Sequence, residues 1–308
     1  MSAARPKLLV VCGPTATGKT ALAIRLAETL NGEIINADSM QVYRYMNIGT
    51  AKPDAAERQR AAFHVIDVAD PDDTFSTGRF KKAADRAAVD ILARGRVPII
   101  AGGTGLYIKA LVHGLWEGPS ADPDLRHRYK AQEKEKPGVL YERLRRVDAV
   151  RAAEVHPADF VRIERALEVF DVTGRPLSEF QQEHRFSESL YRVLKIGLHR
   201  DRDELAAAVE GRVDRMMEQG WLGEVRDLRR RGYEASLPSQ AAIGYKELHQ
   251  HLDGELTLAD ALRRTKTSTR KFAKRQRTWF GADDAIRWFD VAECDAAGVA
   301  ASAFLAEE

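Results

Sequence analysis

The order of hydrophobic and polar positions predicts strands that alternate with helices over the first third of the chain. Residues 8–11 form a short apolar run that ends at a turn signal, which is typical of a buried strand. Apolar residues with helical spacing follow at residues 21–30, and a second apolar run at residues 33–37 predicts another strand. A further succession of strand, glycine turn and helix occurs at residues 97–111. This alternation indicates an α/β domain with a parallel sheet flanked by helices.

The rest of the chain continues this pattern, with one interruption. Further strands are expected at residues 63–68, 191–198 and 286–289, and helices at residues 76–94, 203–220, 224–231 and 293–305. A stretch rich in Gly and Pro at residues 114–123 marks a boundary, and the charged sequence after it has almost no strand pattern. Short helices are expected there, at residues 124–135, 139–146, 148–155, 160–172 and 177–183. We therefore expect a helical insertion domain at residues 116–189, within an α/β core made of residues 1–115 and 190–308.

The composition excludes several classes of protein. The chain has 308 residues, of which 44% are hydrophobic and 31% charged, as in an ordinary soluble protein. No apolar stretch reaches the roughly 18 residues of a membrane span, and the first residues lack the apolar region of a signal peptide. Cys12 and Cys294 are the only cysteines, so neither a disulfide framework nor a four-ligand zinc site is available. We therefore expect a cytoplasmic protein with no membrane partner.

The sequence GPTATGKT at residues 13–20 fits the phosphate-loop pattern G-x-x-x-x-G-K-[ST], and it joins the first predicted strand to the first helix, as that motif requires. Glycines let backbone N–H groups turn inward around an anion, and the N-terminus of the helix adds its positive dipole. Lys19 would neutralise phosphate charge, and the Thr20 hydroxyl is placed to hold Mg²⁺. The predicted site comprises Gly13, Pro14, Thr15, Ala16, Thr17, Gly18, Lys19 and Thr20. The alternative is a glycine-rich turn with a purely structural role.

Two polar residues follow other predicted strands and are expected near this loop. Ligands of open α/β sheets bind beyond the carboxyl ends of the strands, and Asp38 follows the strand predicted at residues 33–37. It could be a general base or a partner of Mg²⁺, or it could simply cap a short helix. Thr104 follows the strand and glycine pair at residues 97–103. Either a ligand contact or close packing would account for that second junction.

Residues 263–280 are strongly basic and end in aromatic residues. Eight cations and no acid lie within the fifteen residues from Arg263 to Arg277, and Trp279 and Phe280 follow. Like charges four residues apart in a helix repel each other by a few tenths of a kcal/mol, so such a run indicates an anionic partner. Phosphate backbones are the usual partner, and the aromatic rings offer flat surfaces to bases. The alternative is a solvated helix whose aromatic residues belong to the core.

Seven segments carry a resemblance to a known family. They are, in chain order, GPTATGKT, INADSMQVYR, IGTAKP, GGTGLYIKAL, RALEVF, GYKE and KRQRTWF. Together they resemble the tRNA dimethylallyltransferase family, over nearly the whole chain from residue 8 to residue 289. The family's fold is a P-loop NTPase-like core with a helical insertion and a basic groove for the anticodon arm, in agreement with the boundaries expected above. Two distant cysteines exclude the C-terminal zinc finger of eukaryotic members, so the chain resembles the shorter bacterial form. Thr17 stands where many members have serine.

The resemblance implies a specific reaction. The family transfers a dimethylallyl group from dimethylallyl diphosphate to the N6 amine of the adenosine 3′ of the anticodon, at tRNA position 37, which gives N6-isopentenyladenosine and diphosphate. Residues 13–20 would then bind the diphosphate of the prenyl donor with Mg²⁺ rather than a nucleoside triphosphate. Asp38 matches the family's general base, while Lys19 and Thr20 would stabilise the leaving diphosphate. Arg212 is a further candidate for diphosphate binding.

The resemblance also implies a set of tRNA contacts. Asp38 and its neighbours would read the flipped base, and further contacts would come from the insertion and from the C-terminal part of the chain. The implied residues are Asp38, Ser39, Met40, Gln41, Thr104, Arg126, Val161, Arg162, Ile163, Glu164, Arg165, Gly244, Tyr245, Lys246, Lys274, Arg275, Gln276, Arg277 and Trp279. The partners are therefore expected to be the anticodon stem-loop of tRNA and dimethylallyl diphosphate, bound by a monomer.

Three other functions stay open at this point. A small-molecule or nucleotide kinase would place ATP in the phosphate loop, and an isopentenyltransferase acting on free adenine nucleotides would use the same chemistry. Neither of these two functions would use the basic run from Arg263 to Arg277. A non-catalytic RNA-binding protein gated by a nucleotide would use both features, but it would not need Asp38.

Overall fold

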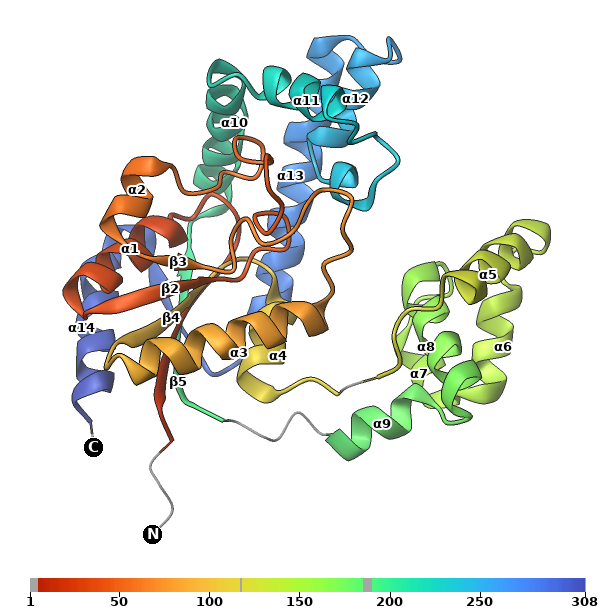
Figure 1. Cartoon of the computed structure of the whole chain (residues 1–308), viewed down its shortest axis with the longest axis horizontal. Coiled ribbons are helices and arrows are strands. Elements are labelled where there is room, and N and C mark those ends of the chain that lie inside the picture. The colour runs from red at the N-terminus through yellow and green to blue at the C-terminus, as the bar shows by residue number, and fades with distance from the viewer. Residues whose placement is uncertain (1–4, 117, 185–189, 308) are drawn as a thin grey trace. The chain divides into compact units, whose positions relative to one another are not determined.

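The computed structural model describes residues 5–116, 118–184 and 190–307, which Figure 1 draws in colour. The chain divides into two compact units, one made of residues 1–112 and 190–308 and the other of residues 113–189. The second unit interrupts the sequence of the first and begins three residues before the insertion expected at residue 116. The expected end of the insertion falls at residues 185–189, outside the described residues, as do residues 1–4 at the N-terminus.

Within the described residues, the first unit contains a six-stranded sheet of order β3-β2-β4-β1-β5-β6. Its strands are β1 (Lys7–Cys12), β2 (Gly32–Asn36), β3 (Phe63–His64), β4 (Val97–Ala101), β5 (Arg192–His199) and β6 (Ile286–Asp290). All neighbouring strands are parallel, so their carboxyl ends meet at one edge. This confirms the predicted α/β class, and it places the segments that follow β1, β2 and β4 side by side.

Helices cover both faces of this sheet. One face forms a buried cluster with α1 (Lys19–Thr29) and α14 (Cys294–Ala306). The other face packs against α3 (Thr77–Ala93) and α4 (Gly105–His113), and this core extends to the C-terminal helices. The strands β1, β2 and β4 are buried on both sides, which explains the apolar runs in their sequences.

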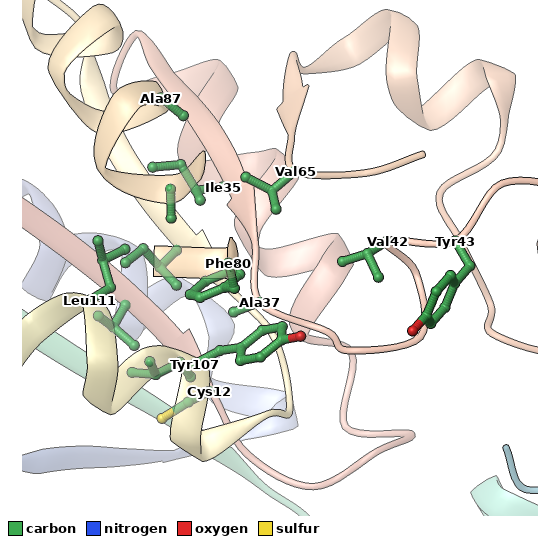
Figure 2. Packing of buried hydrophobic residues seen from close by; sticks show 14 of the residues in the cluster. Cys12, Ile35, Ala37, Val42, Tyr43, Val65, Phe80, Ala87, Tyr107 and Leu111 are labelled. Atoms are coloured by element: carbon green, nitrogen blue, oxygen red, sulfur yellow. The ribbon is translucent and has the colours of Figure 1, made fainter. Parts of the chain in front are cut away.

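The larger core reaches the sheet edge where β1 and β2 end. The rings of Phe80 and Tyr107 stack there with centroids 4.0 Å apart, and Figure 2 shows them beside Ala37 and Cys12. Phe80 and Ala37 are fully buried. Such packing fixes the position of the residue after Ala37, which is Asp38.

Four further helices of the first unit lie in its C-terminal part. They are α10 (Arg202–Glu218), α11 (Trp221–Arg230), α12 (Tyr245–Leu252) and α13 (Leu258–Gly281), with short 3₁₀ turns η1 (Pro238–Ala241) and η2 (Val291–Glu293). In Figure 1, α12 lies beside the N-terminal part of α13, and α11 lies beside α12. The basic run predicted at residues 263–280 lies entirely on α13, which begins earlier because the Thr257 side chain accepts a hydrogen bond from the Asp260 N–H. None of the described helices is both long and apolar enough to cross a membrane.

The second unit is helical in its described part. It contains α5 (Pro123–Glu135), α6 (Val139–Val147), α7 (Ala149–Glu154), α8 (Phe160–Thr173) and α9 (Leu177–His184), which confirms the helices predicted there. Its core is formed by apolar residues such as Leu144 and Leu167. Asp148 joins two helices, because its carboxylate accepts hydrogen bonds from the N–H groups of Arg151 and Ser178.

The strand predicted at residues 63–68 is wrong beyond its first two residues. After β3, Val65 and Asp67 have left-handed backbone angles, with φ of 59° and 56°. This conformation is rare for any residue other than glycine, and especially for a β-branched one. It ends the pairing with β2, and the Asn36 side chain instead donates a hydrogen bond to the Val65 carbonyl at 3.2 Å.

The sequence analysis also missed a helix, α2 (Ala55–Arg60). A capping box begins this helix, in which Asp54 accepts from the Glu57 N–H and Glu57 accepts from the Asp54 N–H. The signal was present in the sequence as an acidic cap followed three residues later by Glu.

Candidate active site

The phosphate-loop sequence forms a tight turn between β1 and α1. Gly13 and Gly18 have φ of 133° and 79°, and a Cβ atom at Gly13 would lie 2.4 Å from the Leu198 carbonyl oxygen. Only glycine fits such a position without moving the backbone. The buried Thr17 hydroxyl donates a hydrogen bond to the Pro14 carbonyl at 2.9 Å, so a bound anion would meet only the backbone of Thr17.

Lys19 is the first residue of α1, and its ammonium group lies inside the turn. Nζ donates to the Pro14 carbonyl at 2.6 Å. Burial, together with the positive charge of Arg212, lowers the pKa of Lys19 to about 8, while Asp38 acts in the opposite direction. Because burial destabilises the charged form of Lys19, a negative charge bound beside its ammonium group would be stabilised.

Asp38 follows β2 at the same edge of the sheet. Its Oδ1 atom accepts hydrogen bonds from the N–H groups of Met40 at 2.8 Å and Gln41 at 3.3 Å. The residue therefore caps a turn rather than a helix. Its Oδ2 atom has no hydrogen-bond donor among the residues that the structure describes. One carboxylate oxygen thus holds the turn, and the other is available for chemistry.

Thr104 holds this turn from the neighbouring strand end. Its Oγ1 atom accepts the Ser39 N–H at 3.0 Å, and its own N–H donates to the Ala37 carbonyl at 3.0 Å. A Cβ atom at Gly102 would lie 2.2 Å from that carbonyl oxygen. The glycine pair is therefore needed for close packing, and Thr104 positions the backbone beside Asp38.

Arg212 on α10 supplies a second cation near Lys19. Burial lowers the pKa of Arg212, and the negative charge of Asp38 partly opposes this shift. Within the described residues, the Arg212 guanidinium has no hydrogen bond or ion pair. It lines a cavity of about 920 Å³ together with Thr20, Tyr45 and Lys52. A half-buried arginine without a protein acceptor is suited to an anionic ligand.

Comparisons with known proteins agree with this arrangement. The family model described as IPP transferase matches residues 41–283, and the model described as isopentenyl transferase matches residues 6–75. The chain belongs to the IPP transferase family. The "tRNA dimethylallyltransferase" of Geobacter metallireducens is 50% identical over 287 residues, which cover 93% of each chain. The resemblance on which the sequence analysis relied is thus confirmed.

Solved structures of IPP transferase relatives share the fold. The full-length "tRNA isopentenylpyrophosphate transferase" of Bacillus halodurans is 38% identical, with a TM-score of 0.72 and coverage of 96% of both chains. A eukaryotic dimethylallyltransferase, described as acting on tRNA, is 30% identical with a TM-score of 0.79. That match covers 93% of this chain and 74% of the eukaryotic one. The parallel-sheet core derived above is therefore the fold of these transferases.

Of the RNA contacts that the family resemblance implies on α13, Gln276 has a different environment from the others. Its side chain is buried, with Oε1 accepting the Thr15 N–H at 2.8 Å and Nε2 donating to the Gly103 carbonyl at 2.9 Å. The amide therefore joins α13 to the phosphate loop and to the turn after β4. A direct contact between this amide and RNA would require both hydrogen bonds to break. By contrast, Trp279 is 47% exposed.

The cations of α13 fall into two groups. Arg263, Lys266 and Arg270 form ion pairs with Asp260, Asp214 and Glu210, so acids of the same helix and of α10 neutralise them. The other five cations have no ion pair in the described part of the chain: Arg264, Lys271, Lys274, Arg275 and Arg277. Of these, Lys274 and Arg277 line a groove of about 500 Å³ between α10 and α13. The solvated-helix interpretation therefore holds for the first group, and an anionic partner would meet the second.

Some of the residues in the insertion that the family resemblance implies as RNA contacts are exposed, and others are buried. Val161 and Arg162 are exposed, but Ile163 belongs to the buried core. Glu164 is also buried, and its Oε1 atom has no hydrogen-bond partner in the region described. The side chain of Ile163 cannot reach RNA, so the expectation for that residue is limited to its backbone.

Two arginines of the insertion are held by one buried acid. Glu168 accepts two hydrogen bonds from Arg126, at 2.8 and 2.9 Å, and one from Arg165 at 2.5 Å. Burial alone would raise the pKa of Glu168, but these hydrogen bonds lower it to about 2. Both arginines are thus fixed in orientation, and part of their charge is already neutralised.

Part of the stretch from Gly244 to Lys246, which the family resemblance also implies as a tRNA contact, is buried. Tyr245 is fully buried, and its hydroxyl donates to Glu224 Oε1 at 2.6 Å. The Gly244 N–H donates to Glu247 at 2.7 Å, while Lys246 is exposed. Tyr245 therefore has a structural contact that the sequence analysis did not predict, and Glu224 was missed altogether.

Proposed function

We propose that this chain transfers a dimethylallyl group from dimethylallyl diphosphate to the N6 amine of the adenosine 3′ of the anticodon in tRNA. One observation carries the proposal: Asp38, with a free carboxylate oxygen, lies at the same sheet edge as Lys19, and Arg212 of α10 is close enough to influence the pKa of Lys19. A base and a cationic pocket are the two features that alkylation of an aromatic amine by a diphosphate ester requires. Family membership supports the same reaction.

Each proposed catalytic residue has one task. The lone pair of N6 forms a bond to C1 of the prenyl group while the bond from C1 to the diphosphate oxygen breaks. Asp38 accepts the proton that N6 loses, through the oxygen that does not cap the turn. Lys19, Arg212 and the backbone N–H groups of the phosphate loop stabilise the charge that develops on diphosphate.

We propose Mg²⁺ as the metal, held by Thr20 and the diphosphate oxygens. The Thr20 hydroxyl lines the same cavity as Arg212 and makes no hydrogen bond with the residues described. Oxygen donors suit Mg²⁺, which usually binds few protein ligands when a substrate supplies phosphates. When bound, Mg²⁺ would neutralise charge on the diphosphate.

The decisive experiment uses unmodified tRNA and dimethylallyl diphosphate as substrates. After incubation, the tRNA is digested and its nucleosides are analysed by mass spectrometry. We expect an adenosine that has gained one dimethylallyl group, with no requirement for ATP. Turnover of ATP without prenyl transfer would instead favour a kinase, and equal activity on free AMP would favour the nucleotide-specific transferase.

The unpaired cations of α13 are proposed to bind the tRNA backbone. We expect Lys274→Ala or Arg277→Ala to weaken tRNA binding, and each lost phosphate contact to reduce the slope of log affinity against log salt by roughly 0.7–0.9. The matched control is Arg263→Ala on the same helix, because Asp260 already pairs with Arg263. An unchanged slope for Lys274→Ala and Arg277→Ala would place both side chains outside the RNA contact.

We further propose that the protein acts as a monomer in the cytoplasm. Both cysteines are free thiols, which suits a reducing compartment. Sedimentation of the protein with and without tRNA would test the oligomeric state, and a dimer in both conditions would contradict the proposal.

A further inference from the structure

A carboxylate from α11 occupies a nest of backbone N–H groups in the loop at residues 47–51. Glu224 Oε2 accepts from the N–H groups of Asn47 and Ile48, both at 2.8 Å. Its Oε1 atom accepts from the Gly49 N–H at 3.2 Å and from the Tyr245 hydroxyl. Three consecutive N–H groups that converge on one carboxylate form an anion site, and here the protein itself supplies the anion.

The contact between α11 and this loop is also sterically tight. A Cβ atom at Gly49 would lie 2.0 Å from Trp221 Nε1, and one at Gly244 would lie 1.9 Å from the other end of the same indole. Trp221 is almost completely buried. The loop therefore has one position relative to α11, defined by the Trp221 ring and by the Glu224 carboxylate.

The same loop fixes the orientation of the Gln41 side chain. Gln41 Nε2 donates to the carbonyls of Thr50 and Ala51, each at 3.0 Å. Both amide hydrogens are thus used, so the amide cannot reverse without breaking two hydrogen bonds. Gln41 Oε1 has no donor within the described residues. Gln41 belongs to the turn capped by Asp38, which accepts the Gln41 backbone N–H.

We infer that Glu224 is a positioning residue that acts through this loop on Gln41. The carboxylate fixes residues 47–49, and the next two carbonyls fix the Gln41 amide. The amide then keeps its acceptor oxygen in one orientation, on a residue of the turn that Asp38 caps. This oxygen accepts a hydrogen bond from an exocyclic amine of an RNA base, and a base with a carbonyl at that place is rejected. The inference rests on the proposed function, because it assigns Gln41 to the RNA that receives the prenyl group.

The test is a double-mutant cycle between two residues that do not touch. We expect Gln41→Ala to lower kcat/KM for an anticodon stem-loop by about tenfold or more, because a buried polar contact to the base is lost. Glu224→Gln should lower it by about tenfold, mainly through KM, since an amide cannot accept from all the N–H groups of the nest. The double variant should be no worse than Gln41→Ala alone, because residues in one network are not additive.

Two controls separate this role from a general structural one. The pair Glu224→Gln and Lys274→Ala should be additive in log kcat/KM, and the affinity for dimethylallyl diphosphate should be unchanged in Glu224→Gln. The inference is wrong if the effects of Glu224→Gln and Gln41→Ala on log kcat/KM are also additive. It is equally wrong if Glu224→Gln lowers the affinity for dimethylallyl diphosphate as much as the affinity for RNA.

A second measurement does not depend on activity. The side-chain amide protons of Gln41 should be protected from hydrogen exchange in the native protein and should lose that protection in Glu224→Gln, at a temperature where both proteins are folded. Unchanged protection would overturn the inference. A native protein that fails to prenylate tRNA would overturn the proposed function instead.

Discussion

Replacement of Asp38 by Asn is expected to lower the turnover number for tRNA prenylation by about 10²–10⁴-fold, the usual contribution of a positioned acid–base group. The substitution is well matched to the site. An Asn side-chain oxygen can still accept the N–H groups of Met40 and Gln41, as Asp38 Oδ1 does. The amide cannot take a proton from N6, so chemistry is lost while the turn remains.

Asp38→Ala provides the comparison, because it removes both the base and the cap of the turn. We expect a similar loss of turnover in the two variants, with a larger KM for tRNA only in Asp38→Ala. Binding of dimethylallyl diphosphate, measured by calorimetry, should not weaken in Asp38→Asn, since Lys19 and Arg212 lose a negative neighbour. If Asp38→Asn retained its turnover, Asp38 would not be the base.

The sheet and the phosphate loop could be predicted because their determinants are local. A buried parallel strand requires a continuous apolar run, as at residues 8–11, and the loop requires glycine at fixed places, as at Gly13. The segment after β3 could not be predicted in this way. Residues 63–68 have a composition typical of a strand, but their backbone is decided by contacts with other segments, such as the hydrogen bond between Asn36 and Val65.

The charges of α13 show a second limit of sequence reasoning. The run from Arg263 to Arg277 contains no acid, so its sequence indicates an anionic partner for the whole helix. In the structure, α10 supplies Glu210 and Asp214 to part of it. Pairing of this kind depends on which helices lie side by side, and no local pattern contains that information.

The residues that support the site were the hardest to recognise. Glu224 lies in an ordinary amphipathic helix, and its sequence gives no sign that it binds three N–H groups of a distant loop. Gln276 sits among cations that suggest RNA, although both ends of its amide bind backbone groups of the core. Such roles depend on contacts across more than 170 residues of sequence.

Replacement of Lys19 by Met is expected to weaken binding of dimethylallyl diphosphate and to lower turnover by about 10²–10³-fold, as for other preorganised groups that stabilise developing negative charge. The pH dependence gives a sharper test of the same residue. In the free protein the pKa of Lys19 is lowered to about 8, mainly by burial. Lys19 therefore loses its proton as the pH rises through about 8, and the affinity for the diphosphate should fall over that range.

Bound diphosphate stabilises the ammonium form and raises this pKa, so kcat should be less sensitive to alkaline pH than kcat/KM. Lys19→Arg is the matched variant, because its charge persists throughout the range. It should remove the decline in diphosphate affinity near pH 8 whatever its effect on turnover. Affinity that is independent of pH in the native protein, or an equal decline in Lys19→Arg, would exclude Lys19 as the titrating group. In that case Arg212 and the backbone N–H groups of the phosphate loop would have to bind the diphosphate without it.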